Sequence, residues 1–286
     1  MRTVSIVAVL AALVLAAGAQ SGVEPTGSTW LHAYRGSGSW VSIYDTKAWR
    51  APEAVVATLA AHHVGTLYLE TGNARQKVDV VRPEVVGRFV DAAHAAGIDV
   101  VGWYVPSFAN NAKDVRRSLA GARFESSTGS HFDGFALDIE STTIRSIPRR
   151  TRRAVAFATA VHAALPARYP LGAITIDPVG ARYWPGYPFA ALARTVQVFL
   201  PMAYFTARTS GARHVRAYSA ANIEEIRRLV HDPSFPIHPI GGETRRASLA
   251  ELRAFFDASD ACKTLGSSLW EYGQTRPSQW ALLASR

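Results

Sequence analysis

Short apolar segments alternate with longer segments of helical pattern along the chain. The apolar or β-branched segments begin about 32 residues apart on average, which is the length of one strand-plus-helix unit. Their length and their content of Val, Ile and aromatic residues indicate buried strands. We predict eight of them, at residues 40–45, 64–71, 99–106, 132–140, 171–177, 196–204, 236–242 and 266–272.

The segments between the strands carry helix signals. Pro52 and Pro83 each open such a segment, at the first-turn position where a helix tolerates proline, and Gly97 ends the second segment. Ser248 and Glu251 have the spacing of a capping box. Alternating strands and helices indicate a parallel sheet of the α/β class, and eight such units predict a single (β/α)8 TIM barrel. An open doubly wound sheet is the alternative, but no glycine-rich nucleotide-binding motif follows the first strand.

The beginning of the chain has the pattern of a secretory signal peptide. Arg2 precedes an uncharged stretch, and Ala17 and Ala19 have the spacing of a cleavage site. We expect a signal peptide at residues 1–19, an exposed lead-in at 20–39 and the barrel at 40–286. A membrane anchor is the alternative, although the apolar stretch is short for a span. The mature chain is therefore expected to be secreted, extracellular and without a stable membrane span.

The composition limits the partners of the protein. The 286 residues include 31 Lys and Arg against 22 Asp and Glu, a formal net charge of +9. This charge favours anionic partners, and for an exported protein we expect anionic cell-wall polymers. No basic helix or aromatic-and-glycine motif indicates nucleic-acid binding. Cys262 is the only cysteine, so no internal disulfide can form and the stability must come from the core.

Acids and aromatic residues gather at the ends of the predicted strands, where barrel active sites lie. Side chains alternate between the two faces of a strand, and we take the more apolar face to contact the helices. Several acids crowded at one place raise one another's pKa, so function is a better reason for them than stability. With aromatic rings beside them, they predict a carbohydrate site. The residues expected there are Tyr44, Glu70, Tyr104, Asp138, Glu140, Asp177, Met202, Tyr204 and Trp270.

Other chemistries find little support in the sequence. It contains no HExxH motif, no cysteine pair and no clustered set of histidines, so we expect neither a metal nor a cofactor. A GxSxG nucleophile motif is also absent. A lyase or deacetylase that uses the same acids is less favoured, because no activated lysine is evident.

The segment DGFALDIE, residues 133–140, resembles the DGxDxDxE signature of glycoside hydrolase family 18, the chitinase family. The run Met202-Ala203-Tyr204 is similar to the MxY element of that family, and Trp270 resembles its barrel-floor tryptophan. A weaker similarity links the DxE of the fourth strand and Trp270-Glu271-Tyr272 to the family 25 muramidases. Overall the chain most resembles a divergent group of exported barrels described as glycoside hydrolases.

The resemblance implies hydrolysis of a polysaccharide that contains N-acetylhexosamine, such as chitin or peptidoglycan. Glu140 would be the general acid and base, Asp138 would orient the N-acetyl group of the substrate, and Tyr204 would hydrogen-bond that group. The other mouth residues would bind substrate. Within the same class, Asp138, Asp177 or Glu70 could instead serve as a nucleophile or a water-activating base. Ala136 replaces the inner aspartate of the signature, so a barrel that binds glycan without cleaving it is the alternative function.

Overall fold

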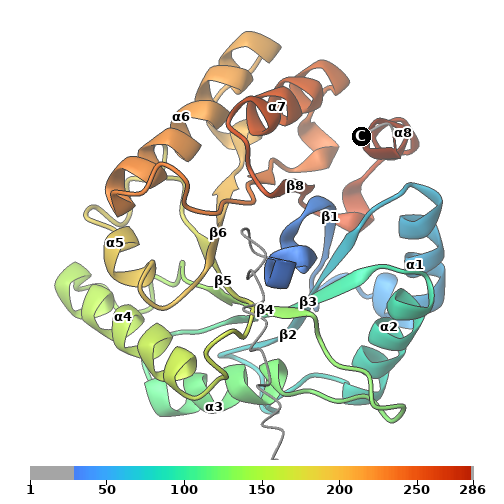
Figure 1. Cartoon of the computed structure of the whole chain (residues 1–286), viewed down its shortest axis with the longest axis vertical. Coiled ribbons are helices and arrows are strands. Elements are labelled where there is room, and N and C mark those ends of the chain that lie inside the picture. The colour runs from blue at the N-terminus through green and yellow to red at the C-terminus, as the bar shows by residue number, and fades with distance from the viewer. Residues whose placement is uncertain (1–28, 285–286) are drawn as a thin grey trace, which may run out of the picture.

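The computed structural model describes residues 29–284. Eight parallel strands form a closed barrel in sequence order, with the helices around it (Figure 1). This confirms the predicted (β/α)8 TIM barrel. The strands are β1 (Gly36–Val41), β2 (Thr66–Asn73), β3 (Asp99–Val105), β4 (Gly134–Asp138), β5 (Leu171–Thr175), β6 (Val198–Ala203), β7 (Ile240–Gly241) and β8 (Gly266–Leu269).

The helix signals of the sequence are present in the structure. Pro52 and Pro83 are the first residues of α1 and α2. The Ser248 side chain accepts a hydrogen bond from the backbone of Glu251, and the Glu251 side chain accepts one from the backbone of Ser248, which completes the capping box. The α-helices are α1 (Pro52–Ala61), α2 (Pro83–Ala95), α3 (Asn111–Ala122), α4 (Ile147–Ala163), α5 (Phe189–Leu192), α6 (Ala212–Val230), α7 (Leu249–Ala261) and α8 (Pro277–Ala284). Short 3-10 helices are η1 (Thr29–Tyr34), η2 (Ala48–Arg50), η3 (Phe205–Ala207), η4 (Thr244–Arg246) and η5 (Tyr272–Gln274).

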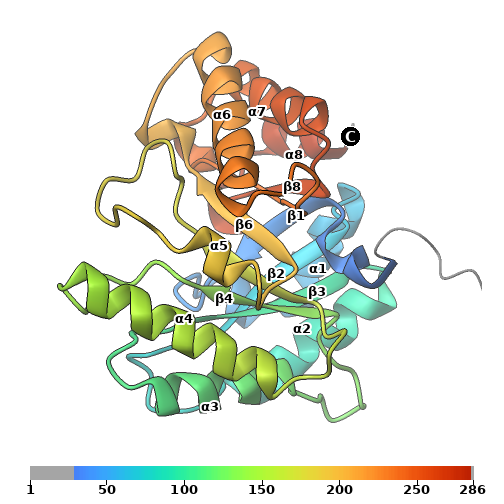
Figure 2. The same cartoon turned by 60° about the vertical axis from the view of Figure 1, so that its left-hand side comes forward.

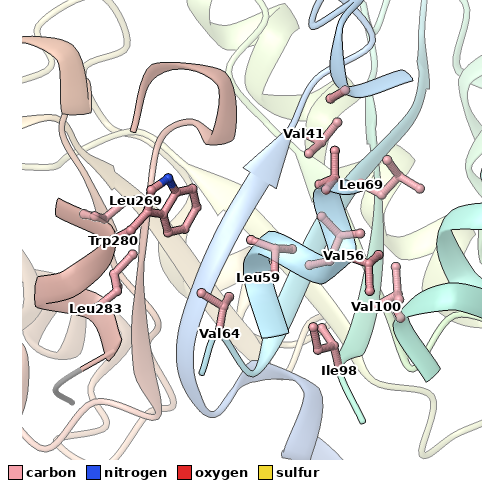
Figure 3. Packing of buried hydrophobic residues seen from close by; sticks show 14 of the residues in the cluster. Val41, Val56, Leu59, Val64, Leu69, Ile98, Val100, Leu269, Trp280 and Leu283 are labelled. Atoms are coloured by element: carbon pink, nitrogen blue, oxygen red, sulfur yellow. The ribbon is translucent and has the colours of Figure 1, made fainter. Parts of the chain in front are cut away.

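Helices α6 and α7 lie side by side on one flank of the barrel, and α3 and α4 lie on another (Figure 2). Valine, leucine and tryptophan side chains fill the layer between the strands and the helices (Figure 3). On one side of the barrel, Val41 and Leu69 from two neighbouring strands pack in the same buried cluster as Val56 and Leu59 of α1. Complete burial of one such side chain stabilises the fold by roughly 1.5–3 kcal/mol.

Large side chains also fill the inside of the barrel. Trp40 and Tyr68 stack with their ring centroids 4.2 Å apart, and both are fully buried. Val101 and Ala136 belong to the same buried cluster. The barrel therefore has a second, inner core, and open space is left only at its ends.

The first strand begins at Gly36 rather than at Trp40, and the residues just before it close one end of the barrel. Leu31 and Tyr34 of η1 are buried, whereas His32 and Arg35, in the same part of the expected lead-in, are exposed. The Tyr34 hydroxyl has two backbone oxygens as acceptors for its single proton, that of Phe135 at 2.9 Å and that of Pro170 at 3.0 Å. Both acceptors lie at the beginnings of strands, so η1 covers the N-terminal end of the barrel, in the centre of the ring in Figure 1.

The signal peptide predicted for residues 1–19 lies outside the described residues and stays a prediction. Across residues 29–284, no helix combines the length and the apolar character that a membrane crossing requires.

Candidate active site

A cavity of about 770 Å³ occupies the C-terminal end of the barrel, opposite η1. Side chains from the ends of all eight strands, or from the loops that follow them, line it. Seven of the nine predicted site residues meet there: Tyr44, Glu70, Asp138, Glu140, Met202, Tyr204 and Trp270.

Asp138 and Glu140 lie next to each other on the wall of this cavity that β4 provides. Asp138 is the last residue of β4, and Ile139 between the two acids is fully buried on the opposite side. The Ile139 backbone is held on both sides. Its N–H donates to the oxygen of Ile174 at 2.9 Å, and its oxygen accepts from the hydroxyl of Tyr187, also at 2.9 Å. The spacing of the two carboxyl groups is therefore fixed by the backbone.

Burial disfavours the ionised form of both acids. Burial raises the pKa of the Asp138 carboxyl well above its usual range, and the nearby Glu140 and Glu70 carboxylates raise it further. Burial also raises the pKa of Glu140. The Oδ1 atom of Asp138 is buried and has no hydrogen-bond partner among the described residues. A carboxyl group with a raised pKa keeps its proton to a higher pH than a free one and can donate it to a bound molecule.

Glu70, in the second half of β2, is a third acid of the cavity. Its Oε2 accepts a hydrogen bond from the Ile43 backbone N–H at 2.9 Å, and its Oε1 accepts one from Asn73 Nδ2 at 3.2 Å. Asn73 Nδ2 also donates to the hydroxyl of Tyr44 at 3.0 Å. Burial raises the pKa of Glu70 to about 7, and the charge of Glu271 contributes to the increase. Glu70 can therefore exchange a proton near neutral pH.

Glu271 is a fourth acid of the cavity and is absent from the predicted set. Burial raises its pKa, and its Oε1 accepts a hydrogen bond from Gln274 Nε2 at 3.1 Å. Its Oε2 is buried and has no partner among residues 29–284. Glu271 follows Trp270, to which a cis peptide bond joins it, and both residues line the cavity. The Trp-acid-Tyr run of the sequence was the signal that could have identified Glu271.

Aromatic rings form the inner end of the cavity. Trp270 lies near Trp103, Trp40 and Tyr204, with ring centroids 6.0, 6.1 and 6.3 Å away respectively. Burial raises the pKa of the Tyr204 hydroxyl, and the charges of Glu140 and Asp138 raise it further, so this group stays a hydrogen-bond donor. The arrangement offers apolar ring faces beside the acids, as the binding of a sugar ring requires.

Two tyrosines extend the aromatic surface to the rim of the cavity. Tyr44 follows β1 and is 65% exposed, whereas Tyr183 follows β5 and is 42% exposed. The two strands are four positions apart in the ring of eight, so the tyrosines stand on opposite sides of the mouth. Tyr183 and Trp103 are site residues that the sequence interpretation missed.

The structure contradicts the predicted place of Tyr104. Trp103 and Val105 of β3 face the cavity, and Tyr104 points to the opposite side. Its hydroxyl donates to Asp114 Oδ1 at the beginning of α3, at 2.9 Å. The prediction was wrong because both faces of β3 are buried, so the more apolar face does not identify the side of the helices.

Asp177 is also outside the cavity, although the sequence placed it there. Ile174 is the residue of β5 that lines the cavity. The Asp177 carboxylate accepts two hydrogen bonds from Arg208, at 2.9 and 3.1 Å, and a third from the hydroxyl of Tyr218 on α6. Asp177 therefore holds the loop after β5 against α6 and η3. Among residues 29–284, the group of side chains that could hold a metal ion also lies elsewhere.

Comparison with known proteins identifies solved structures that have a similar fold. Neither a protein-family model nor a curated protein matches the sequence. Many solved structures are similar, among them the following three. The Bacillus cereus spore cortex-lytic enzyme SleL has 11% identity over 87% of this chain and 73% of that one, with a TM-score of 0.64. A chitinase from Bacteroides thetaiotaomicron has 10% identity, coverages of 88% and 94%, and a TM-score of 0.63. The endo-β-1,4-mannanase from Thermotoga petrophila has 11% identity, coverages of 84% and 68%, and a TM-score of 0.63. At these identities the likeness shows the barrel fold.

Proposed function

We propose that the protein is a glycoside hydrolase that cleaves a polysaccharide, with Glu140 as the general acid and base. One observation carries the proposal: Asp138 and Glu140 lie on one wall of an open cavity at the C-terminal end of the barrel, and burial raises the pKa of both. A carboxyl group whose pKa is raised keeps its proton to a higher pH and can donate it to the oxygen of a glycosidic bond. The structural neighbours named as a chitinase, a mannanase and a cortex-lytic enzyme support a glycan as substrate.

The residues beside Glu140 suit a substrate with an N-acetyl group. Glu140 donates its proton to the glycosidic oxygen while the bond to the anomeric carbon breaks. The carbonyl oxygen of the N-acetyl group attacks that carbon from the other face, with Asp138 and the Tyr204 hydroxyl beside it. Glu140, now ionised, then accepts a proton from the water that opens the cyclic intermediate. Chitin and peptidoglycan both carry the required group.

A second carboxylate of the cavity could replace the N-acetyl group in this reaction. Glu70 lies in the cavity and is close enough to Asp138 to raise its pKa. Asp177, the other residue considered for this role, is engaged by Arg208 outside the cavity and is no longer a candidate. Carboxyl groups about 5 Å apart favour retention of configuration, and groups about 6.5–9.5 Å apart favour inversion.

Glu140→Gln tests the proposal. The variant keeps the shape of the side chain but removes the proton donor, so hydrolysis should slow by roughly 10²- to 10⁴-fold. The assay measures reducing ends released from chitin, peptidoglycan, β-mannan and anionic exopolysaccharides. Glu125→Gln, which alters an exposed glutamate outside the cavity, is the matched control. If the wild type and Glu140→Gln cleave a glycan at the same rate, Glu140 is not the catalytic acid.

A barrel that binds glycan without cleaving it is the second candidate. The observation that favours it is Ala136, which is fully buried below Asp138 and offers no carboxylate to share a proton with it. This protein would retain glycans from the same panel and release no product from any of them. Product release by the wild type therefore decides between the two functions.

We also propose that the protein acts outside the cell. The signal-peptide pattern at residues 1–19 supports export, and the net charge of +9 favours attachment to anionic wall polymers. Expression of the full chain, followed by N-terminal sequencing of the product in the medium, tests both the export and the cleavage after Ala19.

A further inference from the structure

A group of metal-ligating side chains lies at the end of the barrel opposite the cavity. His32 belongs to η1, Asp99 is the first residue of β3, and Asp133 directly precedes β4. One ligating atom from each of the three lies within 4.8 Å of those of the other two. The histidine is more than half exposed, and both carboxylates are partly buried. An ion from solvent can therefore reach all three.

The separation of His32 and Asp99 is compatible with two ligands of one ion. His32 Nε2 lies 3.6 Å from Asp99 Oδ1, which is too long for a good hydrogen bond. Two ligands bound to Zn²⁺ at about 2.0–2.1 Å and at the tetrahedral angle lie about 3.3 Å apart. A divalent cation would also neutralise the two neighbouring carboxylates.

Asp133 is already held in place by groups around it. Its Oδ2 accepts a hydrogen bond from the Val100 backbone N–H at 2.7 Å, and it lies 2.9 Å from His94 Nε2. A histidine that contacts a ligating carboxylate is a common feature of metal sites, because it orients the ligand. His94 comes from the last turn of α2, so four separate elements of the fold meet at this point.

We propose that His32, Asp99 and Asp133 bind one Zn²⁺ ion, with His94 as a positioning residue. Imidazole with carboxylate suits a zinc ion, whereas Ca²⁺ and Mg²⁺ prefer sets made of oxygen alone. Three protein ligands and a water molecule complete a four-coordinate site. The site is far from the acids of the cavity and independent of glycoside hydrolysis. Its effect is to fasten η1 to the first residues of β3 and β4, and so to stabilise the closed end of the barrel.

Zinc binding by the full-length protein tests the proposal. After treatment with a chelator and its removal, titration calorimetry with Zn²⁺ alone should give one ion per chain. The ion should also raise the melting temperature. His32→Ala and Asp99→Asn should abolish both effects, and His94→Ala should weaken binding by roughly 10- to 100-fold. Melting curves in chelator show that each variant is folded.

His131→Ala is the matched control, because His131 is also an exposed histidine beside an acid, Glu125, at 4.0 Å. It should leave the affinity and the stoichiometry unchanged. If His32→Ala and Asp99→Asn bind Zn²⁺ as the wild type does, or if the wild type binds none, the cluster consists only of two histidine–aspartate ion pairs and the proposal is wrong.

Discussion

Glu70 Oε2 accepts a hydrogen bond of 2.9 Å from the backbone N–H of Ile43, which joins the second half of β2 to the loop after β1. This bond favours the ionised carboxyl group, but burial outweighs it and raises the pKa to about 7. The folded protein therefore holds a proton on Glu70 between pH 4.5 and about 7, and the unfolded chain does not. Raising the pH through this window favours the unfolded chain.

We predict that Glu70→Gln makes the free energy of unfolding less dependent on pH in this window. The wild type loses about 1.4 kcal/mol per pH unit from this group, or roughly 3 kcal/mol over the whole window. Urea denaturation at several values between pH 4 and pH 8 measures the effect. Glu84→Gln, on the exposed side of α2, should keep the wild-type slope. An unchanged slope in Glu70→Gln would show that Glu70 is ionised throughout.

We predict that Asp177→Ala destabilises the protein and leaves its catalytic constants unchanged. The Asp177 side chain is 4% exposed and the Arg208 side chain is 35% exposed, so water compensates part of the loss. The expected cost is about 2–3 kcal/mol. Glu53→Ala, which breaks the exposed Glu53–Arg88 pair, should cost much less. A large fall in kcat for Asp177→Ala would contradict this prediction and indicate that Asp177 takes part in catalysis.

Tyr104→Phe should reduce stability without affecting turnover. The variant removes one hydrogen bond to Asp114, which keeps the backbone N–H of Phe108 as a donor at 2.9 Å. A hydrogen bond to a charged group contributes about 1.5–3 kcal/mol. Tyr204→Phe is the informative comparison, because the same atom is removed inside the cavity and kcat should fall. Equal kinetic losses in both variants would contradict the orientation of β3.

Tyr44→Ala and Tyr183→Ala should raise KM for a long glycan roughly tenfold each, which corresponds to about 1.4 kcal/mol of binding free energy. Both rings are exposed at the rim of the cavity, so they should contribute more to binding than to kcat. Val179→Ala removes an exposed apolar side chain outside the cavity and should leave KM unchanged. KM values for a disaccharide should be insensitive to both tyrosines. If neither variant affects a long substrate, the rim does not bind glycan.

The strand-and-helix pattern was sufficient to predict the barrel, because each unit carries its own local signals. The pattern also predicted correctly that Glu70, Asp138 and Glu140 face the cavity. The opposite side of each of these segments is clearly apolar, so the direction of the acids could be inferred. Alternation failed for β3 because the inside of this barrel is packed with aromatic rings such as Trp103. The prediction for Asp177 failed because its partner, Arg208, is distant in the sequence. Such a pair cannot be recognised from the local sequence.

The beginning of β1 was missed for a related reason. Gly36 and Gly38 look like loop residues, but the structure favours glycine at both. Gly36 has a φ of +70° with open space beside it, whereas Gly38 has no room for a side chain. A Cβ atom on Gly38 would lie 2.5 Å from the ring of Tyr68, and one on Gly266 would lie 2.1 Å from the backbone oxygen of Gly36. Glycine inside a strand often marks such a close approach, and only the three-dimensional neighbours distinguish it from a turn.

The pairing of β1 with β8 determines when the protein can fold. Gly36 is opposite Gly266, so the ring is completed by residues from the two ends of the described chain. While the ribosome is still making the later units, β1 has a free edge that can pair with other chains. Contacts this distant in sequence form slowly. In an incomplete chain of this protein, that edge of β1 therefore stays without its native partner until β8 has been made.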